Sequence, residues 1–340
     1  MHTDPAKLKR GRISRAIIAI LMLAVFNLVG FIFFFIMSHN NHLELLTQQV
    51  IVDSEHSFNT IESDKLRYLN TTLALLMANR AIANAFKERD REALLALCLP
   101  LFNHIKRNNG ITHWYFHEAE PDKRCFLRIH KPDLYGDRIT RITFDRAIET
   151  KQLASGKELG KTALAIRAVH PFYLDEALIG YIELGVDIDY LFRNFVATTG
   201  NHYGLFVEKS LLDRFKWDSV RSVKRLRDSW DDHNRYLLLY QTPLLDRIDP
   251  DLKKGNFIGA IPDQAKAFNR IVRGRNAYSR GMFPFYDVLG RKIGAVYILR
   301  NFNQHVSLVR SKSMFFIVMT FLFVGIVTFL MVFLHKRGER

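Results

Sequence analysis

The side chains best suited to binding chemistry in this sequence are arginine, histidine and glutamate residues set among apolar neighbours. Arg128 and His130 are separated by one residue, so in a strand both would point to one face. Arg167 and Glu183 lie in two later apolar stretches. Two arginines can hold a carboxylate through paired hydrogen bonds, and a glutamate can accept from an amine. These residues predict a site for a small organic anion or an amino acid, unless Arg167 and Glu183 form a buried ion pair that only orders the sheet.

Aromatic and basic neighbours extend this candidate site. Trp114 and Tyr135 can flank the apolar part of a ligand, and His117 is a further candidate contact. Arg138 and Arg141 are expected at the surface or in local salt bridges.

Histidines offer a second interpretation, a metal-ion sensor. His113, His117, His130 and His170 have the imidazoles that zinc, copper or nickel prefer. His113 and His117 are four strand residues apart, roughly 13 Å by strand rise, which is too far to share one ion. No metal and no cofactor is therefore expected.

An enzyme is not expected either. The sequence has no Gly-x-Ser-x-Gly, no phosphate-binding glycine loop and no His-Glu-x-x-His. His117-Glu118 resembles an acid/base pair, but no nucleophile accompanies it. A binding module needs no such group.

The periodicity of the sequence predicts an α+β fold. Residues 38–89 lack glycine and proline and predict a long helix, whose leucine stripe would pack on its own module, on a partner subunit, or on both (Leu66, Leu69, Leu73, Leu76). A second helix is expected over 90–106, with a bend at Pro100. Beyond Gly110 the period becomes two, which predicts antiparallel strands with turns at 118–122 and 175–176 and a helix at 145–153; the strands are 112–117, 125–130, 163–169 and 180–186.

A repeat indicates a second copy of the same module. Pro171-Phe172-Tyr173 followed by Ile179-Gly180 matches Pro284-Phe285-Tyr286 followed by Ile293-Gly294. In each copy a strand ends, a polar turn follows and an apolar strand begins. Two structural copies are expected, the second beginning near Gly204.

Two apolar blocks, residues 16–37 and 314–334, are long enough to cross a bilayer, which takes about 20 helical residues. The first block is alternatively a cleaved signal peptide. Basic residues precede the first block and follow the second, which predicts that both ends are cytoplasmic and that 38–313 lies outside the inner membrane.

Charge and cysteine content add little about partners. The net charge is +15, which suits an anionic ligand or lipid head group as well as an ordinary basic surface. Nucleic acid is not expected, because an extracytoplasmic domain does not meet it. Cys98 and Cys125 are the two cysteines, and the sequence is compatible both with a disulfide bridge between them and with two buried free thiols.

The layout resembles the double Cache sensor domains of bacterial chemoreceptors and sensor histidine kinases, above all the double sensory domain of two-component sensor kinases. The residues that carry the resemblance are segments 113–117, 126–132, 135–137, 158–160, 165–171 and 180–185. It covers roughly residues 40–310 and is more specific in the first module than in the second.

The resemblance implies two tandem PAS-like antiparallel-sheet modules behind a long stalk helix, a homodimer, and a small-molecule ligand in the membrane-distal module. The expected organisation is a cytoplasmic N-terminus (1–15), membrane helix (16–37), stalk helices (38–110), distal module (111–199), proximal module (200–301), connecting helix (302–313), membrane helix (314–334) and cytoplasmic tail (335–340). Members usually continue into an output domain. With six residues after the second block, we expect a separate signalling partner or a remnant of a longer receptor. A scaffold that binds a partner protein or lipid, with a vestigial pocket, is the alternative function.

Overall fold

The computed structural model describes residues 5–119, 121–160, 164–223, 228–253 and 261–337. They form two compact units. The first contains residues 1–49, 272–278 and 301–340, and the second contains 50–271 and 279–300.

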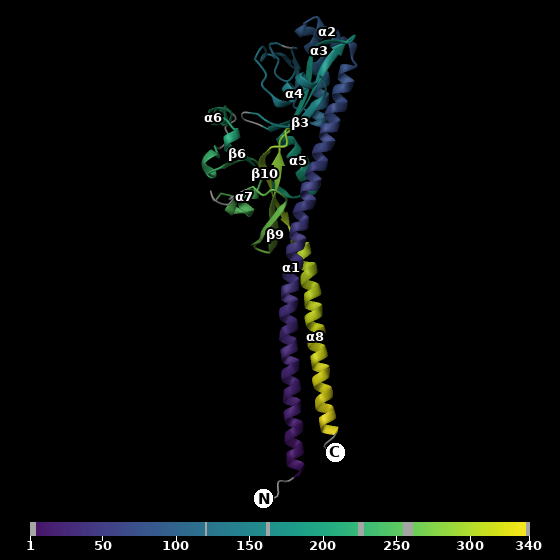
Figure 1. Cartoon of the computed structure of the whole chain (residues 1–340), viewed down its shortest axis with the longest axis vertical. Coiled ribbons are helices and arrows are strands. Elements are labelled where there is room, and N and C mark those ends of the chain that lie inside the picture. The colour runs from purple at the N-terminus through teal and green to yellow at the C-terminus, as the bar shows by residue number, and fades with distance from the viewer. Residues whose placement is uncertain (1–4, 120, 161–163, 224–227, 254–260, 338–340) are drawn as a thin grey trace. The chain divides into compact units, whose positions relative to one another are not determined.

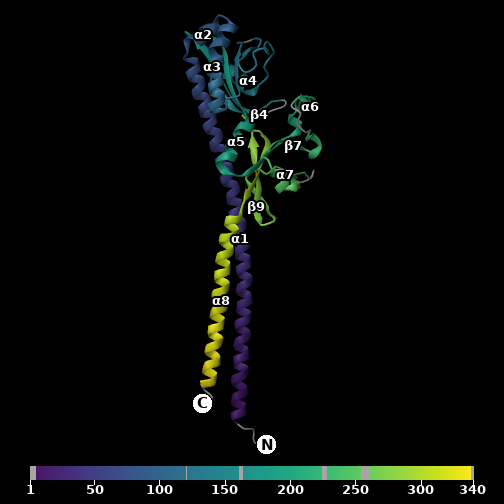
Figure 2. The same ribbon diagram turned by 180° about the vertical axis from the view of Figure 1, so that it is seen from behind.

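The first unit consists mainly of two long helices. Helix α1 (Pro5–Met77) begins in this unit and α8 (Asn303–Arg337) ends in it. In Figures 1 and 2 the two run side by side with both chain termini at the same end, and the Phe35 and Phe316 rings pack with centroids 6.1 Å apart. Within the part of the chain that the structure describes, one helical segment, Asn303–Leu330, is long and apolar enough to cross a membrane, with a mean hydropathy of 2.5. The span expected at 16–37 is helical within α1 and stays a prediction.

The second unit begins with helices and an antiparallel sheet, which we call the first module. After α1 come α2 (Arg80–Lys87) and α3 (Arg91–Asn109). Five strands then form a sheet in the order β2-β1-β5-β4-β3. The remaining elements are β1 (His113–His117), β2 (Cys125–Arg128), α4 (Ile142–Thr150), β3 (Ala154–Leu159), β4 (Leu164–Leu174), β5 (Ala177–Asp187) and α5 (Ile188–Thr199).

The second module repeats this topology, with a sheet in the order β7-β6-β10-β9-β8. The strands β6, β7, β8, β9 and β10 correspond in turn to β1, β2, β3, β4 and β5. The predicted repeat is confirmed, because Pro171-Phe172-Tyr173 lies at the end of β4 and Pro284-Phe285-Tyr286 at the end of β9. Its elements are β6 (His202–Glu208), η1 (Lys209–Leu211), α6 (Arg214–Val223), η2 (Trp230–Asp232), β7 (Tyr236–Gln241), α7 (Leu245–Ile248), η3 (Pro250–Lys253), β8 (Lys266–Arg273), β9 (Asn276–Tyr286) and β10 (Lys292–Asn301).

Local sequence explains where these elements begin and end. The Asp90 side chain accepts a hydrogen bond from the Ala93 amide at the start of α3. Gly110 ends the helix with φ of 68°, and an added Cβ would lie 2.0 Å from the Tyr190 ring, so both conformation and space require glycine. At the β4–β5 turn Asp175 and Glu176 both have positive φ, as a two-residue hairpin with the twist of its strands requires.

Several predicted boundaries differ from the observed ones. The predicted helix 38–89 is interrupted at Asn79, whose side chain caps α2. The predicted strand 125–130 ends at Arg128, and the predicted helix 145–153 begins three residues earlier, at Ile142. Strand β3 was not predicted. Ala163 and Glu120, which fall in a predicted strand and turn, lie outside the described residues.

The leucine stripe of α1 packs on its own chain. Leu69, Leu73 and Leu76 are buried in the second unit. Leu66 is half-buried, and the homodimer stays a prediction.

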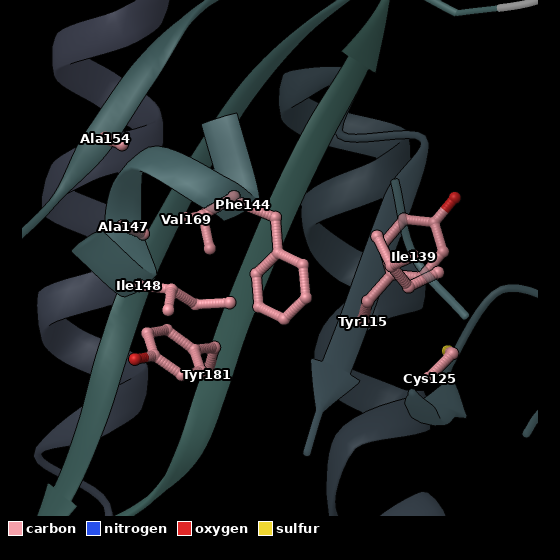
Figure 3. Close-up of a cluster of buried hydrophobic side chains, with 9 residues drawn as sticks. All are labelled: Tyr115, Cys125, Ile139, Phe144, Ala147, Ile148, Ala154, Val169 and Tyr181. Atoms are coloured by element: carbon pink, nitrogen blue, oxygen red, sulfur yellow. The ribbon is translucent and has the colours of Figure 1, made fainter. Parts of the chain in front are cut away.

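The first sheet carries an apolar cluster on each face. On one face, the Phe86 ring from α2 lies 5.1 Å from that of Phe116 and 6.0 Å from that of Phe172. On the other, Phe144 and Ile148 of α4 point toward Tyr181, as Figure 3 shows. The face covered by α4 also carries the polar residues of the candidate site.

Candidate functional site

Pairing of the strands brings the predicted polar residues to the α4 face of the first sheet. Tyr115 of β1 lies opposite Arg128 on one side and Glu183 on the other. Arg167 of β4 lies opposite Gly185, two residues beyond Glu183 on the same face. Arg128, Arg167 and Glu183, which are far apart in the sequence, therefore share one surface.

Glu183 is the centre of a buried ionic cluster. Its carboxylate accepts from Arg167 Nη1 at 2.5 Å and from Arg141 Nη1 at 2.6 and 2.8 Å. The second carboxylate oxygen lies 2.8 Å from His117 Nε2. Glu183 and His117 are fully buried. Burial opposes ionisation, but the two arginines outweigh it and hold the Glu183 pKa well below 4.5.

Arg141 belongs to this cluster, and the sequence prediction for it was wrong. It was expected at the surface or in a local salt bridge, but it pairs with Glu183, 42 residues away, and its side chain is 19% exposed. It also donates to the Tyr115 hydroxyl at 3.1 Å. Arg141 lies in a segment without periodicity, just before α4, so the sequence offered no signal of its direction. Arg138 is exposed, as expected.

Beside this cluster is a hollow of about 390 Å³, lined by His113, Tyr115, Arg128, His130, Lys131, Asp133, Leu134, Tyr135 and Asp137. Arg128 forms a bidentate ion pair with Asp137, with both contacts at 2.7 Å, and donates to the Leu134 carbonyl. Tyr135 is exposed, and the Arg91 guanidinium lies 3.4 Å from its ring centroid. Three predicted residues, Arg128, His130 and Tyr135, therefore line one hollow.

The structure does not bring Trp114 to this hollow. Trp114 alternates with Tyr115, so it faces α2 and α3, where it is fully buried 5.8 Å from the Phe116 ring. A regular strand would place Phe126 on the face of Arg128. A β-bulge places it on the opposite face, 5.5 Å from Phe86, because His117 pairs with Cys125 and leaves Phe126 as the extra residue.

The three histidines of this face are held neutral by burial. Burial lowers the pKa of His113 to about 2 and that of His130 to about 4, and it also lowers the pKa of His117. The described residues contain no group of three or more His, Cys, Asp or Glu side chains that could hold a metal ion. Cys98 and Cys125 are buried free thiols whose pKa burial raises to about 12.

The charges of the hollow and of the Glu183 cluster differ. In the lining of the hollow, Arg128 and Lys131 balance Asp133 and Asp137. In the adjoining cluster, Arg141 and Arg167 share the single carboxylate of Glu183, so with the histidines neutral one positive charge remains there. The site is therefore able to accept a small anion next to aromatic rings.

Sequence comparison agrees with the repeated fold. The sequence profile of the double Cache family described as the double sensory domain of two-component sensor kinase matches residues 53–222. The chain belongs to this family. Its sensor domains bind ligands and are not catalytic, and they are the extracytoplasmic parts of membrane receptors. No match was found among curated proteins.

Solved structures of sensor domains are similar to this double Cache chain at low sequence identity. A domain of a sensory box/GGDEF family protein from Vibrio parahaemolyticus is 12% identical, with TM-score 0.41 over 75% of this chain and 97% of that one. The ligand-binding domain of the Campylobacter jejuni chemoreceptor Tlp3, in complex with 4-methylisoleucine, is 13% identical, with TM-score 0.37 over 78% and 92%. The sensor domain of the V. cholerae histidine kinase DctB is 10% identical, with TM-score 0.38 over 75% and 98%.

Proposed function

We propose that this double Cache chain is a membrane-anchored, extracytoplasmic sensor whose first module binds a small organic anion or amino acid. The observation that carries the proposal is the hollow beside Tyr115, which adjoins the Glu183 cluster with its one positive charge in excess. Its volume of about 390 Å³ falls in the range of small-molecule sites. Arg128 and Lys131 supply donors for a carboxylate, and Asp133 can accept from an ammonium group.

The Glu183 cluster has a supporting role in this proposal. Glu183 already binds Arg141 and Arg167, so both guanidinium groups reach a ligand only by exchanging partners. We place the first contact of the ligand at Arg128, His130 and Tyr135, which line the hollow. Arg141 positions the Tyr115 hydroxyl beneath it.

Membrane anchoring on both sides of the sensor also belongs to the proposal. It is supported by the apolar Asn303–Leu330 segment, by the predicted span at 16–37 and by the basic residues that flank both. Both chain ends would then be cytoplasmic, with the two modules outside the membrane.

Contacts between the modules suggest how binding reaches α8. The Val288 amide, in the β9–β10 turn, donates to the Lys157 carbonyl of β3 at 2.8 Å. Lys157 Nζ pairs with Glu62 at 2.5 Å and lies 4.7 Å from the Phe285 ring centroid. Strand β10 ends at Asn301 and α8 begins at Asn303, so a shift of β3 is passed to the strand that precedes α8.

A thermal-unfolding screen of the full chain in detergent tests whether the chain binds a small molecule and of which class. The panel contains organic acids, amino acids and divalent metals. A ligand at about 100 times its dissociation constant stabilises by roughly 2.7 kcal/mol, which is several degrees for a domain of this size. Arg128→Ala should abolish the shift, while Arg138→Ala, at an exposed arginine outside the hollow, should preserve it. A silent panel with the fold intact would favour the scaffold function, and a response to a metal alone would favour the metal sensor.

Crosslinking between the α8 helices of two subunits tests whether ligand binding moves this helix. Single cysteines introduced along Asn303–Leu330 should crosslink between subunits of the predicted homodimer, and ligand should change which positions react. Background from the two native thiols is small, because both are buried with a raised pKa. A crosslinking pattern that ligand leaves unchanged contradicts transmission through this helix.

A further inference from the structure

The second module contains a hollow of its own, with a volume of about 380 Å³. It lies along β7, the edge strand that corresponds to β2 in the first module. The two modules therefore each have a cavity of ligand size at the same edge of the repeated sheet. Residues in the wall of the second include Asp189, Arg221, Ser229, His233, Tyr240 and Leu252.

Three polar side-chain atoms in this wall are themselves buried. Arg221 Nε, Ser229 Oγ and His233 Nδ1 have no hydrogen-bond partner among the described residues, and Ser229 and His233 are 9% and 3% exposed. A buried polar group without a partner costs about 1–3 kcal/mol, so native proteins rarely keep several together without a reason. A ligand in the hollow is placed to supply these partners.

Arg221 gives the hollow a cation without a carboxylate at ion-pair distance in the described part of the chain. Its guanidinium lies 4.4 Å from the Trp217 ring centroid. Burial lowers its pKa, while the more distant carboxylates Asp228 and Asp189 raise it. A ligand carboxylate would compensate this charge and accept from Nε and from the Ser229 hydroxyl.

A ligand ammonium group would find carboxylates in the same hollow: Asp189 in the first turn of α5 is exposed and lines it, as do Asp232 and Asp246. Apolar surface in the wall comes from Tyr240 and from leucines, which are Leu238, Leu239 and Leu252. We infer that the second module has its own binding site, which takes a small zwitterion with an apolar body, an apolar amino acid. Its carboxylate binds Arg221 and its ammonium group binds Asp189.

This site differs from the one proposed in the first module. The first hollow adjoins a cluster with one positive charge in excess and favours an anion. The second has one half-buried cation, Arg221, beside three carboxylates, and favours a ligand that carries both a carboxylate and an ammonium group. The chain would then respond to two different ligands, one in each module.

Tryptophan fluorescence reports on the second hollow directly. The chain has three tryptophans, and Trp217 and Trp230 lie together near Arg221, with ring centroids 6.4 Å apart. Replacing Trp114 of the first module by phenylalanine leaves only these two. The full-length Trp114→Phe chain in detergent is titrated with L-leucine, L-valine, L-isoleucine, L-methionine and L-phenylalanine. Each is compared with its deaminated acid and its decarboxylated amine, and calorimetry of the unsubstituted chain repeats any response.

We expect a saturable change for at least one amino acid, with both one-ended analogues at least about ten-fold weaker. Arg221→Gln should weaken binding by about ten-fold or more, and so should Asp189→Asn, a surface change that spares the fold. Arg193→Gln is the matched control, because this exposed arginine lies over the Tyr190 ring outside the hollow.

Three results overturn the inference. They are a folded protein that gives no saturable response, binding that neither Arg221→Gln nor Asp189→Asn weakens, and binding lost in Arg128→Ala instead. The last assigns the ligand to the first module. If these titrations are positive but no shift in the thermal-unfolding screen is abolished by Arg128→Ala, the function proposed for the first module is refuted and this site stands.

Discussion

Removing the charge of Glu183 is the most demanding test of the buried cluster. Glu183→Gln keeps the shape of the side chain but leaves Arg141 and Arg167, whose side chains are only 19% and 11% exposed, without their carboxylate. Taking one partner from a buried ion pair costs about 3–5 kcal/mol, because the remaining charge stays desolvated. Whole domains are stable by about 5–15 kcal/mol, so this loss is a large part of the total.

The assay is unfolding of the full chain in detergent at pH 7, followed by near-ultraviolet circular dichroism. At about 2–4 °C per kcal/mol for a domain of this size, the midpoint should fall by roughly 6–20 °C. Glu176→Gln, an exposed glutamate of the same hairpin, is the control and should change stability by less than about 0.5 kcal/mol. The double variant Glu183→Gln with Arg167→Gln should recover part of the loss, because it removes one uncompensated cation.

The same variant has a defined pH dependence. The folded pKa of Glu183 is depressed, so its carboxylate stabilises the fold at pH values above its ordinary pKa of 4.5, and this contribution is lost as the pH falls through the folded value. The stability difference between wild type and Glu183→Gln should be constant from pH 8 to about 5 and shrink below 4.5. A loss under about 1 kcal/mol at pH 7, or a double variant whose loss is the sum of the two single losses, would refute the cluster as described.

Three further predictions concern the same module and its contact with the next. His130, with its folded pKa lowered by burial from 6.5 to about 4, stays neutral where the unfolded chain is protonated, so its contribution is complete above pH 6.5 and is lost as the pH falls toward 4. The free energy of unfolding from urea denaturation should therefore fall more steeply over this pH range in wild type than in His130→Asn, by at most about 1.4 kcal/mol per pH unit. Parallel pH profiles of the two proteins would exclude this role. Gly156→Ala would place a Cβ 2.6 Å from Val288 Cγ2, so we expect a loss of about 1–3 kcal/mol with faster hydrogen exchange at the Val288 amide, and partial rescue by Val288→Gly; an unchanged exchange rate would contradict this contact. Asp137→Asn should release Arg128 from a half-exposed pair at a cost of no more than about 1 kcal/mol in thermal unfolding and should tighten binding of an anionic ligand in calorimetry, whereas weaker binding would show that the pair itself orients Arg128.

Sequence periodicity determined much of the framework. Alternation within one strand is a local property, so it correctly placed Arg128 and His130 on one side, where both line the hollow. The recurring Pro-Phe-Tyr and Ile-Gly segments predicted two modules because each marks the same hairpin. Apolar length and charge predicted a membrane helix at 314–334, which overlaps the Asn303–Leu330 segment that is long and apolar enough to cross a membrane.

Tertiary structure decided which residues of different strands and loops meet. Alternation does not fix the register between strands, and pairing of Tyr115 with Arg128 is what turns Trp114 away from the hollow. The bulge at Phe126 reverses the alternation that a regular strand would keep. Arg141 reaches Glu183 from a segment with no period, and only the position of that segment over the sheet brings the two charges together, so no local pattern could have shown it.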